Sequence, residues 1–120
     1  VVERCEFLRS VGAPRIAACI ESVGPQHGRR VTNAPPGYSW HQFGEAMDCF
    51  LVVHGAADWD AEAHGYKAYA TEAAGLELTP GRKWGDSPHV QLRAHEPHHV
   101  HEVSRLDNML AARFPLFAAL

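Results

Sequence analysis

The stretch SWHQFGEAMDCFLVV (residues 39–53) decides how this chain is expected to fold. It follows APPGY, a segment too rich in proline and glycine for regular structure. Its second half, EAMDCFLVV, is a compact apolar run that ends at HGAADWD, which is typical of a buried strand. We therefore expect a central strand that holds Asp48 near its middle, with His41 on the loop just before it.

Three elements are expected upstream of this stretch. Residues 1–12, VVERCEFLRSVG, place apolar side chains near helical spacing, and Gly12 and Pro14 are typical of a helix end, so we expect a helix. Residues 15–22, RIAACIES, form a short apolar run with β-branched residues near its ends, which favours a buried strand. Residues 31–34, VTNA, are expected to form a brief strand.

Downstream, helix and strand patterns alternate. Residues 61–74 carry alanine and tyrosine at helical spacing, so we expect a helix with Asp60 as N-cap and Gly75 just past its end. HVQLRA alternates as a strand that starts at His89. A final helix is expected over residues 98–113, before a proline.

These elements predict an α+β fold, with helices at both ends of the chain and a small, mainly antiparallel sheet packed with helices. One β-to-α-to-β connection is expected within it. A chain of 120 residues is long enough for one hydrophobic core and short for two, so we expect a single domain over residues 1–120.

Composition excludes several classes of protein. The chain is 46% hydrophobic and 21% charged, as is ordinary for a folded domain. Its formal net charge of -3 leaves no basic footprint for nucleic acid. No run of 18 apolar residues is present for a membrane span, and no secretory signal is visible in the sequence, which begins with Val.

Cysteines and histidines give two further expectations. The three cysteines lack the paired CxxC spacing of a zinc ribbon, so we interpret them as small buried residues, with one disulfide among them as the alternative. Nine histidines are many for this length, which is compatible with metal binding, with pH sensing or with neither.

A catalytic zinc uses three protein ligands drawn from His, Asp, Glu or Cys and keeps a fourth position open. His41 and Asp48 are two candidates, and His89 is the best third because it opens a strand. Asp86 stands three positions before His89 and offers a carboxylate that can carry a proton for a bound water.

At these residues the chain resembles a known family. SWHQFGEAMD is similar to the SxHxxGxAxD signature of the zinc D-Ala-D-Ala carboxypeptidases and L-alanyl-D-glutamate endopeptidases, a family that includes phage endolysins. VTNA upstream and GLEL, Trp84 and DSPHVQL downstream resemble the endolysin-like branch, so the similarity covers residues 26–92.

The resemblance implies a zinc peptidase domain that binds one Zn through His41, Asp48 and His89, with Asp86 as the catalytic carboxylate. It carries Ser39 over as a residue that shapes the site, and Trp84 lies beside these residues as a wall of the cleft or as a core aromatic. The implied substrate is the peptide stem of bacterial peptidoglycan, cleaved between L-Ala and D-Glu. The implied place of action is the bacterial cell wall, reached by a phage lysin from the host cytoplasm or by a periplasmic or secreted enzyme.

One departure concerns the substrate pocket. The family usually has a Tyr-Arg-Ser stretch at the end of an early strand, whereas here Glu21 stands where that Arg would be. Arg29 or Arg30 is our candidate for the missing positive charge near the substrate. The alternatives to the endopeptidase are a D-Ala-D-Ala carboxypeptidase of the same mechanism and a non-catalytic zinc-bearing binding module.

The densest histidine cluster is interpreted differently. EPHHVHE contains three of the four histidines in this region, but it follows the signature strand and alternates as the start of a solvated helix does. We therefore expect His95, His98, His99 and His101 to lie outside the metal site. Trp40, next to His41, is expected either to wall the cleft or to fill the core.

Overall fold

The computed structural model describes residues 1–23, 32 and 34–120. Within these ranges six α-helices and five short strands are present, and the strands form small antiparallel sheets. The α+β class is therefore confirmed, with more helix than expected. The chain divides into two compact units, residues 43–94 and residues 1–42 with 95–120. No helix of the described ranges combines the length and apolar character needed to cross a bilayer.

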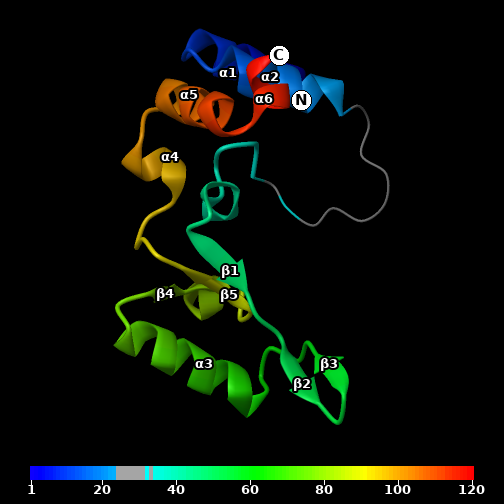
Figure 1. Cartoon of the computed structure of the whole chain (residues 1–120), viewed down its shortest axis with the longest axis vertical. Coiled ribbons are helices and arrows are strands. Elements are labelled where there is room, and N and C mark those ends of the chain that lie inside the picture. The colour runs from blue at the N-terminus through cyan, green and yellow to red at the C-terminus, as the bar shows by residue number, and fades with distance from the viewer. Residues whose placement is uncertain (24–31, 33) are drawn as a thin grey trace. The chain divides into compact units, whose positions relative to one another are not determined.

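The unit formed by the two ends of the chain is helical. It contains α1 (Val2–Ser10), α2 (Pro14–Ser22), α4 (Pro97–Val100), α5 (Val103–Arg113) and α6 (Pro115–Ala118). Figure 1 shows α1, α2, α5 and α6 grouped around the two termini. Their shared core consists of apolar side chains, among them Cys5, Leu8, Ile16, Ala17, Leu106, Leu110 and Phe117.

The first helix ends as its sequence predicts. Gly12 has φ +83, a left-handed conformation that glycine adopts without steric cost. The N–H of Gly12 donates to Arg9 O and that of Ala13 donates to Leu8 O, which is the pattern of a Schellman motif. The expectation of a helix that stops at Gly12 is confirmed.

The expected strand over residues 15–22 is wrong, because this segment is the helix α2. Pro14 occupies the first helical turn, where a missing N–H costs nothing. Ala13, the N-cap residue, offers no side-chain acceptor, but Asp107 of α5 accepts a hydrogen bond from Ile16 N–H at 2.8 Å. The cap of α2 is therefore supplied from a distant part of the chain.

The unit of residues 43–94 holds both sheets. β1 (Ala46–Asp48), β5 (His89–Gln91) and β4 (Thr79–Pro80) form an antiparallel sheet of order β1-β5-β4, with α3 (His64–Gly75) in contact with β4. β2 (Leu51–Val53) and β3 (Ala56–Asp58) form a separate hairpin. Figure 1 shows α3 running below the three-stranded sheet, with the hairpin beyond β1.

The predicted strand over residues 45–53 is thus two strands in two sheets. It breaks at Cys49 and Phe50, so Asp48 ends β1 and does not lie in the middle of a central strand. A run of apolar residues is compatible with one long strand or two short ones, because its pattern does not fix the partners.

The other element boundaries shift by a few residues. The helix expected over residues 61–74 is α3, with Ala63 as its N-cap in place of Asp60 and Gly75 inside it. The strand expected to start at His89 does so. The final helix is divided into α4 and α5. The brief strand expected at residues 31–34 lies partly outside the described residues, since Val31 and Asn33 are not among them.

The buried Asp107 is predicted to be the most sensitive polar residue of the helical unit. Its side chain is 1% exposed and lies 2.9 Å from Arg15 Nε. Replacing Asp107 by Ala leaves the N-terminal N–H of α2 without its acceptor and Arg15 without its counter-ion, at a cost of about 3 kcal/mol. The measurement is the free energy of unfolding in urea.

A matched control is Asn108→Ala, which removes the exposed acceptor of Arg15 Nη2 on the same helix turn. Its expected cost is below about 1 kcal/mol. Equal unfolding free energies for the two variants would contradict the assigned role of Asp107.

Candidate metal centre

Asp48 and His89 face each other across β1 and β5. Cys49 N–H donates to Pro88 O and Leu92 N–H donates to Glu45 O, each at 2.9 Å. In this register Asp48 and His89 are opposite residues between backbone hydrogen bonds, where side chains approach most closely. Asp48 Oδ1 and His89 Nδ1 are 3.2 Å apart.

His41 completes the group from the short 3-10 helix η1 (Trp40–Phe43), which leads into β1. One ligand atom each from His41, Asp48 and His89 lies within 4.8 Å of the others. Atoms bound about 2.0–2.2 Å from a tetrahedral zinc are about 3.3–3.6 Å apart, so the Asp48–His89 distance suits a shared metal. The three predicted ligands are therefore brought together.

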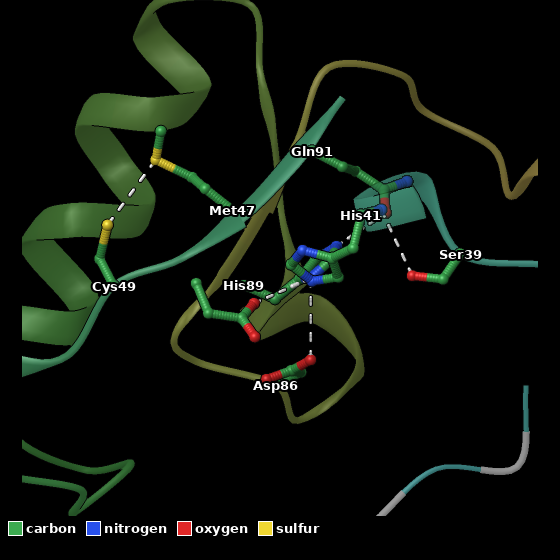
Figure 2. A network of polar contacts seen from close by, with 8 residues as sticks. Ser39, His41, Met47, Cys49, Asp86, His89 and Gln91 are labelled. Atoms are coloured by element: carbon green, nitrogen blue, oxygen red, sulfur yellow. Dashed lines mark hydrogen bonds and ion pairs between the residues drawn. The ribbon is translucent and has the colours of Figure 1, made fainter. Parts of the chain in front are cut away.

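A chain of hydrogen bonds fixes which nitrogen of His89 faces Asp48. Gln91, 1% exposed, donates from Nε2 to Arg93 O at 2.8 Å, so its Oε1 faces His89. His89 Nε2 lies 2.8 Å from that oxygen and must carry a hydrogen, because a carbonyl oxygen only accepts. Figure 2 shows His89 held between Gln91 and Asp86.

This arrangement leaves His89 Nδ1 directed at a carboxylate oxygen. In the neutral ring, with Nε2 protonated, Nδ1 presents a lone pair to Asp48 Oδ1, and two lone pairs 3.2 Å apart repel. A second proton on the ring or a metal cation between the two atoms removes the repulsion. The donor set therefore fits a cation, and Gln91 would orient His89 as a ligand of it.

Sequence reasoning did not single out Gln91. The pattern that identifies it is the alternation of a strand, because residues at positions i and i+2 share a face and Gln91 follows His89 by two. Gln91 is therefore a candidate positioning residue for His89 that lies outside the motif on which the resemblance rests.

Asp86 lies at the edge of this group. Its Oδ2 is 4.0 Å from His89 Nδ1, and its side chain is 51% exposed, so it is accessible to solvent. The turn is closed by Asp86 N–H donating to Gly81 O at 3.0 Å and His89 N–H donating to Asp86 O at 3.1 Å. The predicted carboxylate is thus next to the predicted ligands, without occupying their positions.

Two aromatic residues beside the site have different roles. Trp84 closes the 3-10 helix η2 (Gly81–Trp84), is 48% exposed, and has its ring centroid 5.7 Å from that of His89. Trp40 is buried and donates from Nε1 to His95 O at 2.6 Å. Of the two roles considered for Trp40, the core role is confirmed.

The remaining predicted site residues are placed as follows. Ser39 Oγ accepts a 3.4 Å hydrogen bond from His41 N–H, so it stabilises the turn that carries His41.

Arg29 and Arg30 lie outside the described residues. Glu21 is on α2, where Arg9 donates to it and lowers its pKa, so it does not end an early strand.

The histidine cluster is separate from the metal group. His98 stacks on Tyr38 with ring centroids 4.3 Å apart, and burial beside His99 lowers the pKa of His98. Among the described residues, the only group of three candidate ligand side chains is His41, Asp48 and His89. The expectation that His95, His98, His99 and His101 lie outside the metal site agrees with this geometry.

An apolar cavity of about 360 Å³ lies on the other face of the sheet. Met47 and Val90 line it and are opposite residues of β1 and β5, one position out of phase with Asp48 and His89. Figure 2 shows Met47 directed away from His89, toward the helix side. None of His41, Asp48 and His89 lines the cavity, although Gln91 does.

The cysteines differ from one another in exposure. All three are free, with Cys5 buried, Cys19 half-buried and Cys49 exposed. The prediction of burial is confirmed for Cys5 and wrong for Cys49, because Cys49 follows the last residue of an edge strand. The alternative of a disulfide is not realised in this structure.

Comparison of the chain with protein-family models, with curated proteins and with solved structures gave no match. The family resemblance therefore rests on the motif residues themselves.

Gly81 is predicted to be required for metal binding. A Cβ at this position would lie 2.5 Å from Asp86 O and 2.8 Å from His89 Cβ, so alanine must displace the turn that carries both residues. Gly81→Ala is expected to weaken zinc affinity about 10- to 100-fold, the usual range when support of a ligand is lost. The measurement is competition with a chromophoric chelator.

Gly75→Ala is the matched control, since a Cβ there meets nothing within 4 Å. Circular dichroism establishes that both variants are folded. If folded Gly81→Ala protein bound zinc as tightly as Gly75→Ala, the close packing of Gly81 would have no part in the site.

Proposed function

We propose that this chain is a zinc-dependent peptidase that hydrolyses the peptide stem of bacterial peptidoglycan, with the bond between L-Ala and D-Glu as its target. The observation that carries the proposal is the convergence of His41, Asp48 and His89 with a second carboxylate, Asp86, beside them. Three protein ligands with an adjacent free carboxylate are the composition of a hydrolytic zinc site.

The metal and the protein contribute different parts of the chemistry. A zinc ion in such a site polarises the scissile carbonyl and brings the pKa of a bound water to about 7. His41, Asp48 and His89 would hold the ion, and Gln91 keeps His89 Nδ1 directed at it.

Asp86 would act as the proton carrier. Its carboxylate accepts the proton of the attacking water and returns it to the amine of the leaving D-Glu residue. Its distance from His89 Nδ1, 4.0 Å, leaves it beside the ligands as an uncoordinated base. Trp84, half exposed next to His89, would form a wall for the substrate.

Two alternatives remain in view. The VTNA and DSPH segments favour the endopeptidase, whereas a D-Ala-D-Ala carboxypeptidase would use the same ligands and the same Asp86. The position of Glu21 on a helix, paired with Arg9, favours a non-catalytic zinc-bearing module, because no cationic residue replaces the family's arginine at that place.

The proposed bond predicts a specific product. Peptidoglycan fragments incubated with the zinc-loaded protein should acquire a new amino terminus at D-Glu, detected by mass spectrometry, and a chelator should prevent this. Loss of the terminal D-Ala alone would support the carboxypeptidase. Unchanged fragments, with zinc verified in the protein, would support the binding module.

Asp86→Ala tests the proton carrier. The variant is expected to retain zinc and to lose activity by about 10²- to 10⁴-fold, the usual contribution of a positioned acid-base group. Glu62→Ala removes an exposed carboxylate from the same unit and should leave the rate unchanged. A zinc-bound Asp86→Ala protein with parental activity would exclude Asp86 from proton transfer.

A further inference from the structure

Within the described residues, the β2–β3 hairpin is anchored to α3 by one of its faces. Tyr66 Oη donates to Asp58 O at 2.6 Å and accepts from Leu51 N–H at 3.4 Å, which ties the base of the hairpin to α3. The side chain of Leu51 packs on Gly65, where a Cβ would be 2.6 Å from Leu51 Cδ2. Leu51 and Asp58 are opposite residues, so this face of the hairpin is directed at the helix.

The opposite face of the hairpin is apolar and exposed. Phe50, Val52 and Trp59 are 50%, 65% and 63% exposed. Phe50 and Trp59 flank the first cross-strand pair, and their ring centroids are 5.0 Å apart with planes tilted by 39°. A paired phenylalanine and tryptophan held in solvent by an anchored hairpin indicates a binding surface, because exposing two such rings is costly.

We infer that the Phe50–Trp59 pair is a subsite for a sugar ring of the glycan strand that bears the stem peptide. A pyranose ring has an apolar C–H face, which a flat aromatic ring covers, and hydroxyl groups around its rim, which stay in water or reach a carboxylate. Asp58 and Asp60 stand on either side of Trp59 in the sequence, but their carboxylates accept the backbone N–H of Asp60 and of Glu62, so the hydroxyl groups of the sugar stay in water. This inference rests on the proposed function.

Size and charge favour a sugar over other occupants. Each ring buries at most about 150–250 Å², so the pair falls well below the roughly 1,000 Å² of a stable protein interface. The acidic residues around Trp59 and the carboxylate of Asp48 disfavour an anionic polymer or an anionic lipid surface. The hexosamine rings of the glycan carry no charge once the lactyl carboxyl is joined to the peptide.

The separation of Phe50 from Asp48 along the chain matches the separation of the sugar from the proposed target bond in the substrate. Phe50 follows Asp48 by two residues, which spans at most about 7 Å of extended backbone. In peptidoglycan, one lactyl group and one residue separate the sugar from the L-Ala–D-Glu bond, whereas the terminal D-Ala lies several residues further away. A sugar held at Phe50 and Trp59 therefore places the first peptide bond, and not the last, near the metal ligands.

A binding measurement tests the subsite without requiring activity. Titration with the tetramer of N-acetylglucosamine, followed by tryptophan fluorescence and by calorimetry, should give saturable binding to the parent protein. Trp59→Ala should weaken it about 3- to 10-fold. Val53→Ala, an exposed position on the other face of the hairpin, is the matched control and should bind as the parent does.

Cleavage kinetics separate this inference from the proposed function. The ratio of kcat/KM for the disaccharide-linked stem peptide to kcat/KM for the free peptide should fall about 3- to 10-fold in Trp59→Ala and stay constant in Val53→Ala. An unchanged ratio in an active Trp59→Ala enzyme overturns the subsite alone. If the parent cleaves neither peptide while it binds the tetramer, the peptidase proposal fails and the sugar subsite stands.

The same kind of measurement would reveal a different ligand at the Phe50–Trp59 surface. Sedimentation that shows a dimer lost in Trp59→Ala, or binding to neutral phospholipid vesicles in place of the tetramer, would overturn the sugar assignment. Absence of tetramer binding by the parent protein would do the same.

Discussion

The register between β1 and β5 is the constraint on which the candidate site depends. It makes Asp48 and His89 opposite residues, and the bidentate contact of Arg93 with Glu45 lies just beyond the paired segment. A slip of one residue would turn one of the two ligands to the other face of the sheet, toward Met47 and Val90. The geometry of two three-residue strands thus decides whether a cation has its ligands.

A second layer of polar contacts determines which nitrogen of His89 faces Asp48. The carbonyl of Arg93 orients the amide of Gln91, that amide orients His89, and His89 then presents a single nitrogen to Asp48. Each step is fixed by which atom donates and which accepts. If the three candidate ligands hold a metal, its affinity would therefore depend on a buried amide as well as on those ligands.

The sequence predicted which side chains converge better than it predicted the helices and strands that carry them. His41, Asp48, His89 and Asp86 could be found because their spacing matches a family motif. The helix α2 could not be predicted, because a short apolar run suits strand or helix and its cap comes from Asp107, 91 residues away. The division of residues 45–53 into β1 and β2 depends on pairing partners that no local pattern contains.

Because the three thiols differ in exposure, a label can be attached selectively to Cys49. A thiol-reactive dye would encounter Cys49 in solvent, while Cys5 is enclosed among α1 and its neighbours and Cys19 is partly covered. Because Cys49 adjoins Asp48, a fluorophore on that sulfur would report on the occupancy of the neighbouring ligands without any engineered cysteine. The same accessibility makes Cys49 the position at which two molecules would become linked on storage in air.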